Sequence, residues 1–182
     1  MKRNIGNFFW GATMHLAMSP FMPTAFLRRS LMKIIGVNIP ESSYVVAGTI
    51  IGSNLVRIGE RVGINSYCFL DGAADLILED NVRLGSQVTI ITGTHDIEAN
   101  VLRRDLSKGT IAKPVRIKRG TWIAARVTIL PGVIIGEGCV VGAGSVVTRN
   151  LAPNGLYAGC PARLIRPLPL DESDRTRASI LS

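Results

Sequence analysis

The 182-residue sequence contains few cysteines, histidines and aromatic residues. Its three cysteines, Cys68, Cys139 and Cys160, are odd in number and form no CxxC pair, which argues against a disulfide framework and a zinc site. With only two histidines, His15 and His95, one chain cannot supply three imidazoles to a metal ion. We therefore expect no metal ion, and reduced thiols in a cytoplasmic protein.

Charged residues are also sparse, at 19% of the sequence, but they are unbalanced and give a formal net charge of +8. A basic protein attracts anions, such as a phosphorylated cofactor, an anionic lipid surface or nucleic acid. The sequence has no helix-turn-helix, zinc-finger or RNA-binding signature. We therefore expect no nucleic-acid partner.

The N-terminal segment has no charged side chain from residue 4 to residue 27, which raises the question of a membrane span or a signal peptide. Two prolines and several polar residues interrupt it, and no small-x-small cleavage motif follows. We predict one or two short amphipathic helices over residues 5–35, within a helical cap that spans residues 1–40 and packs His15. Peripheral contact with a membrane is the main alternative, and a cleaved signal the other.

Much of the sequence follows a six-residue repeat. Large aliphatic residues recur at this interval at Ile117, Ile123, Ile129, Ile135, Val141 and Val147. Two earlier runs have the same interval, Ile58 and Ile64, and then Leu78, Leu84 and Ile90. Four positions after each member of the first series come smaller residues, Thr121, Val127, Val133, Cys139, Ser145 and Leu151. A period of six fits neither a helix nor a simple strand, but it fits a short strand followed by a turn. Three such units form a triangular coil that stacks on the next, with Gly and Asn at the corners.

Several motifs follow one another in a fixed order: INSYCFLD, ITGTHD, KPVRI, TWIAARVTILPGVIIGEG, GAGSVVTRN and AGCPARLIR. Together with the repeat, they resemble the hexapeptide-repeat acyltransferases, in particular the galactoside, maltose, nodulation-factor and exopolysaccharide acetyltransferases. The resemblance implies a mainly β protein whose residues 41–166 form a left-handed parallel β-helix, followed by a C-terminal tail over residues 167–182. It also implies a homotrimer.

The repeat stops after Ile91 and resumes near Val115. We predict that residues 92–114 form a protruding loop, because a polar insertion of this length in a compact domain usually carries function. In the sugar O-acetyltransferase branch of the family, the His at the start of this loop is the catalytic base, which implies that role for His95. A neutral imidazole can take the proton of an acceptor hydroxyl that attacks acetyl-CoA, and can then protonate the leaving thiolate.

The same resemblance implies two residues that bind the acceptor, Asn65 and Asp71. For both, a turn residue at a corner of the coil is the alternative interpretation. The resemblance implies seven residues that bind acetyl-CoA: Trp122, Ala125, Ala143, Thr148, Arg149, Arg163 and Arg166. The two last arginines match residues near the cofactor phosphates, for which guanidinium groups are suited.

One departure from the family pattern concerns the Ala124–Ala125 pair, where family members often have Gly-Ser. A hydroxyl contact is lost there, but the N–H group of Ala125 can still stabilise a developing oxyanion.

These observations predict acetyl-CoA-dependent acetylation of a sugar hydroxyl, in the biosynthesis of a surface polysaccharide or glycan precursor. The reaction would take place in the cytoplasm or at the inner face of the membrane. N-acetylation of an amino sugar is one alternative, and a non-catalytic β-helix scaffold is an alternative of another class.

Overall fold

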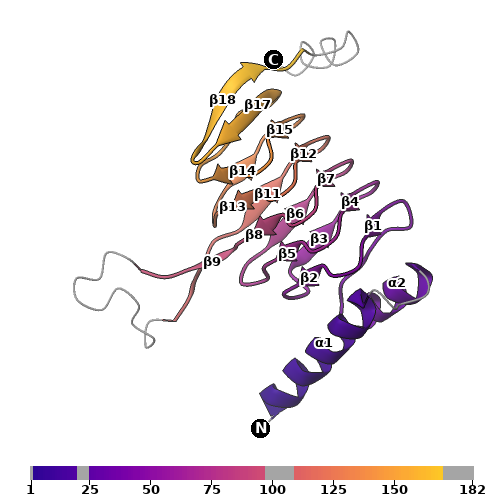
Figure 1. Ribbon diagram of the computed structural model, residues 1–182. Coiled ribbons are helices and arrows are strands. Elements are labelled where there is room, and N and C mark those ends of the chain that lie inside the picture. The colour runs from indigo at the N-terminus through magenta and orange to yellow at the C-terminus, as the bar shows by residue number, and fades with distance from the viewer. Residues whose placement is uncertain (1, 20–24, 97–108, 170–182) are drawn as a thin grey trace, which may run out of the picture.

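The computed structural model describes residues 2–19, 25–96 and 109–169. Two helices come first in this part of the chain, α1 (Lys2–Met18) and α2 (Ala25–Ile34). They lie at one end of a stack of short strands, beside β1 and β2, whereas β17 and β18 close the other end (Figure 1).

The strands form three parallel sheets that the chain visits in turn. Sheet A contains β1 (Tyr44–Val45), β4 (Gly63–Ile64), β7 (Arg83–Leu84), β12 (Trp122–Ile123), β15 (Val140–Val141), β17 (Gly155–Gly159) and β18 (Ala162–Pro167), of which only the last is antiparallel to its neighbour. Sheet B contains β2 (Ile50–Ile51), β5 (Phe69–Leu70), β8 (Thr89–Ile90), β13 (Thr128–Ile129) and β16 (Val146–Val147). Sheet C contains β3 (Val56–Ile58), β6 (Leu76–Leu78), β11 (Val115–Ile117) and β14 (Ile134–Ile135). The chain is therefore a parallel β-helix, as predicted.

The interior consists of aliphatic side chains stacked in register from coil to coil. In sheet B, Ile51, Leu70, Ile90, Ile129 and Val147 follow one another across adjacent strands, and none is more than 1% exposed. Each coil covers the apolar surface of the next, so burial stabilises the stack one neighbour at a time. The smaller residues four positions further on, from Thr121 to Leu151, are buried as well, which confirms the core that the repeat predicts.

The corners of the coil differ in part from the prediction. A positive φ recurs at the residue three positions after an inward-facing aliphatic side chain. The sequence analysis expected Gly or Asn at these corners. The structure places Arg61, Tyr67, Gln87 and Arg126 at four such corners, with φ between 55° and 62°. Their side chains are exposed, so the cost of one left-handed residue, about 1–2 kcal/mol, meets no additional clash with the core.

The two N-terminal helices cap the first coil. Met14, Met18 and Met32 are buried in the same core as the coil, and the N–H group of Gly48 donates to the carbonyl of Met18 at 2.8 Å. The buried positions of α1 form one stripe of the helix, and His15 lies outside it and is exposed. The prediction that His15 packs in the cap is therefore wrong.

Neither helix of the described chain has the length and apolar character needed to cross a membrane. None of the three cysteines is in a disulfide, and two of them lie in the core.

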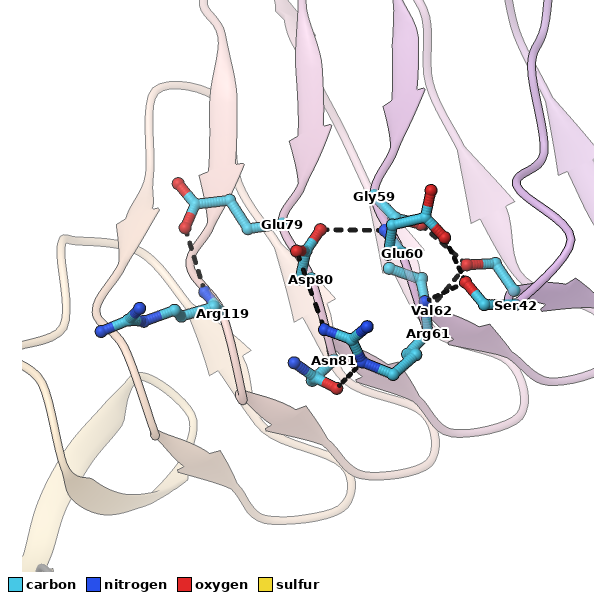
Figure 2. A network of polar contacts seen from close by, with 10 residues as sticks. Ser42, Gly59, Glu60, Arg61, Val62, Glu79, Asp80, Asn81 and Arg119 are labelled. Carbon is cyan, nitrogen blue, oxygen red and sulfur yellow. Dashed lines mark hydrogen bonds and ion pairs between the residues drawn. The ribbon is translucent and has the colours of Figure 1, made fainter. Parts of the chain in front are cut away.

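We name the three edges of the coil by the sheets that they join: A–B, B–C and C–A. The C–A edge carries a network of polar side chains that connect successive coils (Figure 2). Asp80 accepts a hydrogen bond from the N–H group of Glu60 at 2.9 Å, and Arg61 donates to the Asn81 side chain at 2.8 Å. Exposed ion pairs contribute little free energy individually, about 0–1 kcal/mol. The network nevertheless connects charged side chains of successive coils along this edge. No predicted site residue lies on the C–A edge.

Candidate functional site

The predicted site residues lie on the two edges that flank sheet B and on the outer face of sheet A. Asn65, Ala125 and Ala143 are at corners of the A–B edge, and Asp71, Thr148 and Arg149 follow strands of sheet B at the B–C edge. His95 lies on the segment that leaves the same B–C edge after β8, directly after residues 93–94. Trp122, Arg163 and Arg166 lie in strands of sheet A.

At the B–C edge, Asp71 holds the start of the segment that interrupts the repeat. One oxygen of its carboxylate accepts hydrogen bonds from the N–H groups of Thr92 and Gly93, both at 2.9 Å, and from the Thr92 hydroxyl at 3.1 Å. The other oxygen accepts from the N–H group of Gly72 at 2.8 Å. Each carboxylate oxygen has two lone pairs, and this second oxygen accepts one hydrogen bond from the described residues, so one of its acceptor positions remains.

Partial burial alone would raise the pKa of the Asp71 carboxyl, because it disfavours the charged form. The N–H groups of Thr92, Gly93 and Gly72 and the Thr92 hydroxyl donate to the ionised form and together outweigh this effect. The pKa of Asp71 is therefore lower than its ordinary value. The carboxylate is charged at neutral pH and acts as an anchor for main-chain amides.

His95 follows directly on this anchored segment. Strands β9 (Gly93–Thr94) and β10 (Ile111–Ala112) form an antiparallel pair that leaves the side of the coil (Figure 1). The pair is tied to the coil where Lys113 donates its N–H to the carbonyl of Thr92 at 2.8 Å. His95 is half-buried at the end of β9. Residues 97–108 of the predicted loop lie outside the described part of the chain.

At the A–B edge, small residues lie around Ala125, the predicted oxyanion donor. The N–H groups of Ala124 and Arg126 donate to carbonyls of neighbouring coils, at 2.9 Å each, whereas that of Ala125 donates to no group in the described part of the chain. The predicted oxyanion donor therefore has no hydrogen-bond partner among the described residues. A side chain on Gly144, one coil further, would meet nothing within 4 Å, so a ligand can approach the main chain of this edge closely.

A row of outward-facing residues on sheet A links Trp122 to the end of the coil. Trp122 is in register with Val140, Val140 with Leu156, and Leu156 with Arg166. Strands are spaced by about 4.8 Å, so this row spans roughly 14 Å. Trp122 is 53% exposed, and the guanidinium groups of Arg163 and Arg166 each donate to one carbonyl and are exposed. This outer face can accommodate an extended ligand with an anionic end.

A single chain does not bring all the predicted residues together. Asn65 and Asp71 are at opposite ends of one side of the coil, six residues apart, which corresponds to roughly 15–20 Å of extended chain. His95 lies at the same edge as Asp71. A general base must come within about 3 Å of the proton that it abstracts, so His95 cannot act on a hydroxyl group bound at Asn65 of the same chain. Thr148 and Arg149 are likewise separated from Ala125 by sheet B.

Two features near the predicted acceptor position escaped the sequence analysis. The Tyr67 side chain, two residues after Asn65, is 66% exposed and packs over Gly48 of the preceding coil. The guanidinium group of Arg83 lies 5.6 Å from the centre of the Tyr44 ring. An exposed aromatic residue at a corner beside Asn65 was the available signal for the first feature.

No cluster of three or more His, Cys, Asp or Glu side chains that could hold a metal ion occurs among the described residues.

The family model described as "Bacterial transferase hexapeptide (six repeats)" matches residues 114–149. The galactoside O-acetyltransferase of Escherichia coli K12 is 32% identical over 143 residues, which cover 78% of this chain and 68% of that protein. A predicted acetyltransferase of Schizosaccharomyces pombe is 37% identical over 113 residues, which cover 62% of this chain and 53% of that protein. The chain thus spans only slightly more than half the length of this second relative.

Among solved structures, a hexapeptide-repeat-containing acetyltransferase of Vibrio cholerae in complex with acetyl coenzyme A is similar, with a TM-score of 0.73 and 26% sequence identity. The similarity covers 92% of this chain and 89% of that chain.

Proposed function

Because the chain belongs to the hexapeptide-repeat acetyltransferase family, we propose that it transfers the acetyl group of acetyl-CoA to a hydroxyl group of a sugar. The main support is the placement of His95 at the end of the short ladder that leaves the coil, directly after the segment that Asp71 anchors. The main chain just before His95 is anchored, and such an anchor limits where the imidazole can lie, as general base catalysis requires.

When bound, acetyl-CoA supplies an activated acetyl thioester. His95 takes the proton of the acceptor hydroxyl as its oxygen forms a bond to the acetyl carbon, and returns that proton to the sulfur as the carbon–sulfur bond breaks. The N–H group of Ala125 donates to the carbonyl oxygen, where negative charge develops. The products are an acetyl ester and the free thiol of coenzyme A.

The fit of acetyl-CoA is supported by the space beside the main chain at the A–B edge and by the row that leads from Trp122 to Arg166. Arg163 and Arg166 at the end of this row are suited to the cofactor phosphates. Ala143 lines the same edge. Thr148 and Arg149 would reach the cofactor from a second copy of the chain, because they lie on the other edge.

A homotrimer is part of this proposal. If the A–B edge of one chain faces the B–C edge of the next, Asn65 and Ala125 of one copy come close to His95 of another, and three identical contacts close a ring. The outward residues of sheet B support such packing, because none of them is charged: Ile50, Phe69, Thr89, Thr128 and Val146.

Asn65 and the remaining acceptor position of Asp71 are proposed to bind the sugar. We place the reaction in the cytoplasm, in the biosynthesis of a surface polysaccharide or glycan precursor. N-acetylation of an amino sugar requires the same base and the same cofactor, so the assay includes amino sugars.

Peripheral contact of the cap with a membrane remains a proposal. It is supported by large apolar side chains that α1 and α2 expose, namely Phe9, Leu16, Phe26, Leu27 and Ile34. Cosedimentation with anionic phospholipid vesicles tests it, and Phe26→Ser should weaken an association that depends on this surface.

The test of the enzymatic function is the release of thiol from acetyl-CoA with a panel of sugars and amino sugars. We expect His95→Ala to abolish acceptor-dependent release while it leaves acetyl-CoA binding, measured by calorimetry, unchanged. His15→Ala is the matched control, because it removes the other, exposed imidazole. If neither wild-type turnover nor acetyl-CoA binding is detected, the scaffold interpretation replaces the enzyme.

A further inference from the structure

We propose that a pocket between α2 and the first coil binds a phosphate group of the acceptor, so that the acceptor is a sugar phosphate or a sugar linked through phosphate. This inference rests on the proposed function and concerns the substrate class of the same site. It comes from Arg28 and Arg29, two residues to which the sequence analysis gave no role.

The pocket has a volume of about 230 Å³ and lies at the junction of α2, the segment before β1 and the A–B corner of the first coil. Arg28, Arg29, Ile39 and residues 44–47 line it. Figure 1 shows α2 beside β1 at this end of the molecule.

Both arginines are held in place by main-chain carbonyls, and each has donors without a partner in the described part of the chain. Arg28 donates through Nε to the carbonyl of Ala17 at 2.9 Å and through one terminal nitrogen to the carbonyl of Val45 at 3.1 Å. Arg29 donates twice through one terminal nitrogen, to the carbonyls of Glu41 and Ser43 at 2.7 and 2.9 Å. A guanidinium group has five N–H donors, so three on each arginine have no partner among the described residues. Their side chains are preorganised, which lowers the entropic cost of binding an anion.

No carboxylate of the described residues forms an ion pair with Arg28 or Arg29. In the described part of the chain, the ion pairs involve Arg57, Arg61, Arg116 and Arg119, and neither Arg28 nor Arg29. Glu41 contacts Arg29 through its main-chain carbonyl. Residues 1–40 contain no Asp or Glu at all. Two fixed guanidinium groups beside a mainly apolar wall are therefore suited to a phosphate ester, which their remaining N–H groups can bind by charge-assisted hydrogen bonds.

The pocket is one coil away from the proposed acceptor residue. Val46, which lines the pocket, donates its N–H to the carbonyl of Ile64 at 2.9 Å, and the Thr49 hydroxyl donates to the carbonyl of Asn65 at 3.0 Å. Adjacent coils are about 4.8 Å apart, roughly the width of a sugar ring. The exposed Tyr67 ring, which packs over Gly48 beside the pocket wall, offers an apolar surface between the two positions. A sugar bound at Asn65 could therefore place a phosphate between the arginines.

The experiment measures binding to the full-length His95→Ala protein by calorimetry, so that it needs no turnover. The ligands are glucose 1-phosphate, galactose 1-phosphate and N-acetylglucosamine 1-phosphate, each paired with its methyl glycoside, and inorganic phosphate. We expect at least one sugar phosphate to bind at least about tenfold more tightly than its methyl glycoside. This factor corresponds to the free energy of one charge-assisted hydrogen bond. Arg28→Gln should remove this difference and leave the affinity of the methyl glycoside unchanged.

Arg57→Gln is the matched control, because it removes one exposed positive charge on sheet C that does not line the pocket. Thermal unfolding checks that each variant folds, and Arg29→Gln replaces Arg28→Gln if the latter does not. Equal binding within each sugar pair, or equal losses in Arg28→Gln and Arg57→Gln, would overturn the inference. Inorganic phosphate binding as tightly as the best sugar phosphate would overturn the assignment to the acceptor. Phosphate-dependent sugar binding without acetyl transfer to any sugar would instead contradict the proposed function and leave the pocket in place.

Discussion

Replacement of Asp71 by Asn should separate the anchoring of the His95 segment from the binding of the acceptor. The amide of the new side chain can keep its oxygen toward Thr92 and Gly93, but its NH₂ group then faces the N–H of Gly72, which is left without an acceptor. In the opposite orientation, the NH₂ group faces three donors instead of one.

The expected cost follows from the number and kind of these bonds. Hydrogen bonds to a charged group contribute about 1.5–3 kcal/mol, and the loss of one such bond is the minimum in the favourable orientation. Because the anchored residues precede His95 by two and three positions, part of this cost appears as a displacement of the imidazole. A displacement of about 1 Å can reduce a rate on the order of 100-fold. We expect kcat to fall by roughly 10- to 100-fold.

The assay compares kcat, the KM for the acceptor and the KM for acetyl-CoA in Asp71→Asn and in a matched control, Asp75→Asn. The control removes an equal charge from the same connection between sheets B and C, where Asp75 pairs with the exposed Arg57. An anchoring role predicts a fall in kcat with an unchanged KM for acetyl-CoA. A large increase in the acceptor KM with kcat unchanged would refute it and assign Asp71 to direct acceptor binding.

The pH dependence of stability provides a second test of the same bonds. The pKa of Asp71 is lowered in the folded protein, so its stabilisation is complete above the unfolded-state value, about 3.9, and is lost as the pH falls through the folded-state pKa. The difference in melting temperature between wild type and Asp71→Asn should therefore be constant from neutral pH down to about pH 5 and should shrink below pH 4. A difference that does not change with pH would contradict the role of the charge.

Three further predictions concern the coil. Gly85→Ala should destabilise the protein by about 1–3 kcal/mol and raise the KM for acetyl-CoA, because the new methyl group would lie 2.6 Å from the Ala125 nitrogen. Gly11→Ala is the control, since a methyl group there would meet nothing within 4 Å. Equal melting temperatures of the two variants would contradict the close packing at Gly85. Ile129→Ala should cost about 2–5 kcal/mol in denaturant unfolding, since this side chain is fully buried, and a loss below 1 kcal/mol would mean that the coil collapses around the cavity. Arg57→Gln should change the free energy of unfolding by less than about 1 kcal/mol, because its ion pair with Asp75 is exposed. A larger loss would show that this pair contributes more than exposed pairs usually do.

The six-residue repeat predicts the core because each inward position is determined locally. Ile117, Ile123 and Ile129 point inward for the same reason, and each needs only the coil before it and the coil after it. The break between Ile91 and Val115 was visible for the same reason, since it is a gap in an otherwise regular series. The coil corners were predicted less well, because an exposed Arg or Tyr tolerates a positive φ that a buried residue would not.

The anchoring contacts could not be predicted, because they join neighbouring coils at irregular positions. Asp71 accepts from Thr92 and Gly93, which are 21 and 22 residues further along the chain and follow the last regular position before the break. The repeat gives no register there. Arg28 and Arg29 stayed unnoticed because their partners are main-chain carbonyls, which no sequence motif marks.

The order of the features along the coil bears on how two substrates can reach one histidine. The row that ends at Arg166 leads from Trp122 toward the C-terminal end of the coil, and the pocket of Arg28 and Arg29 lies at the opposite, N-terminal end. His95 leaves the coil between these two ends. A cofactor whose phosphates bind at one end and an acceptor whose phosphate binds at the other would therefore meet head to head at the imidazole. In such an arrangement the anionic groups of the two ligands stay several coils apart, so their mutual repulsion is screened and does not oppose the reaction.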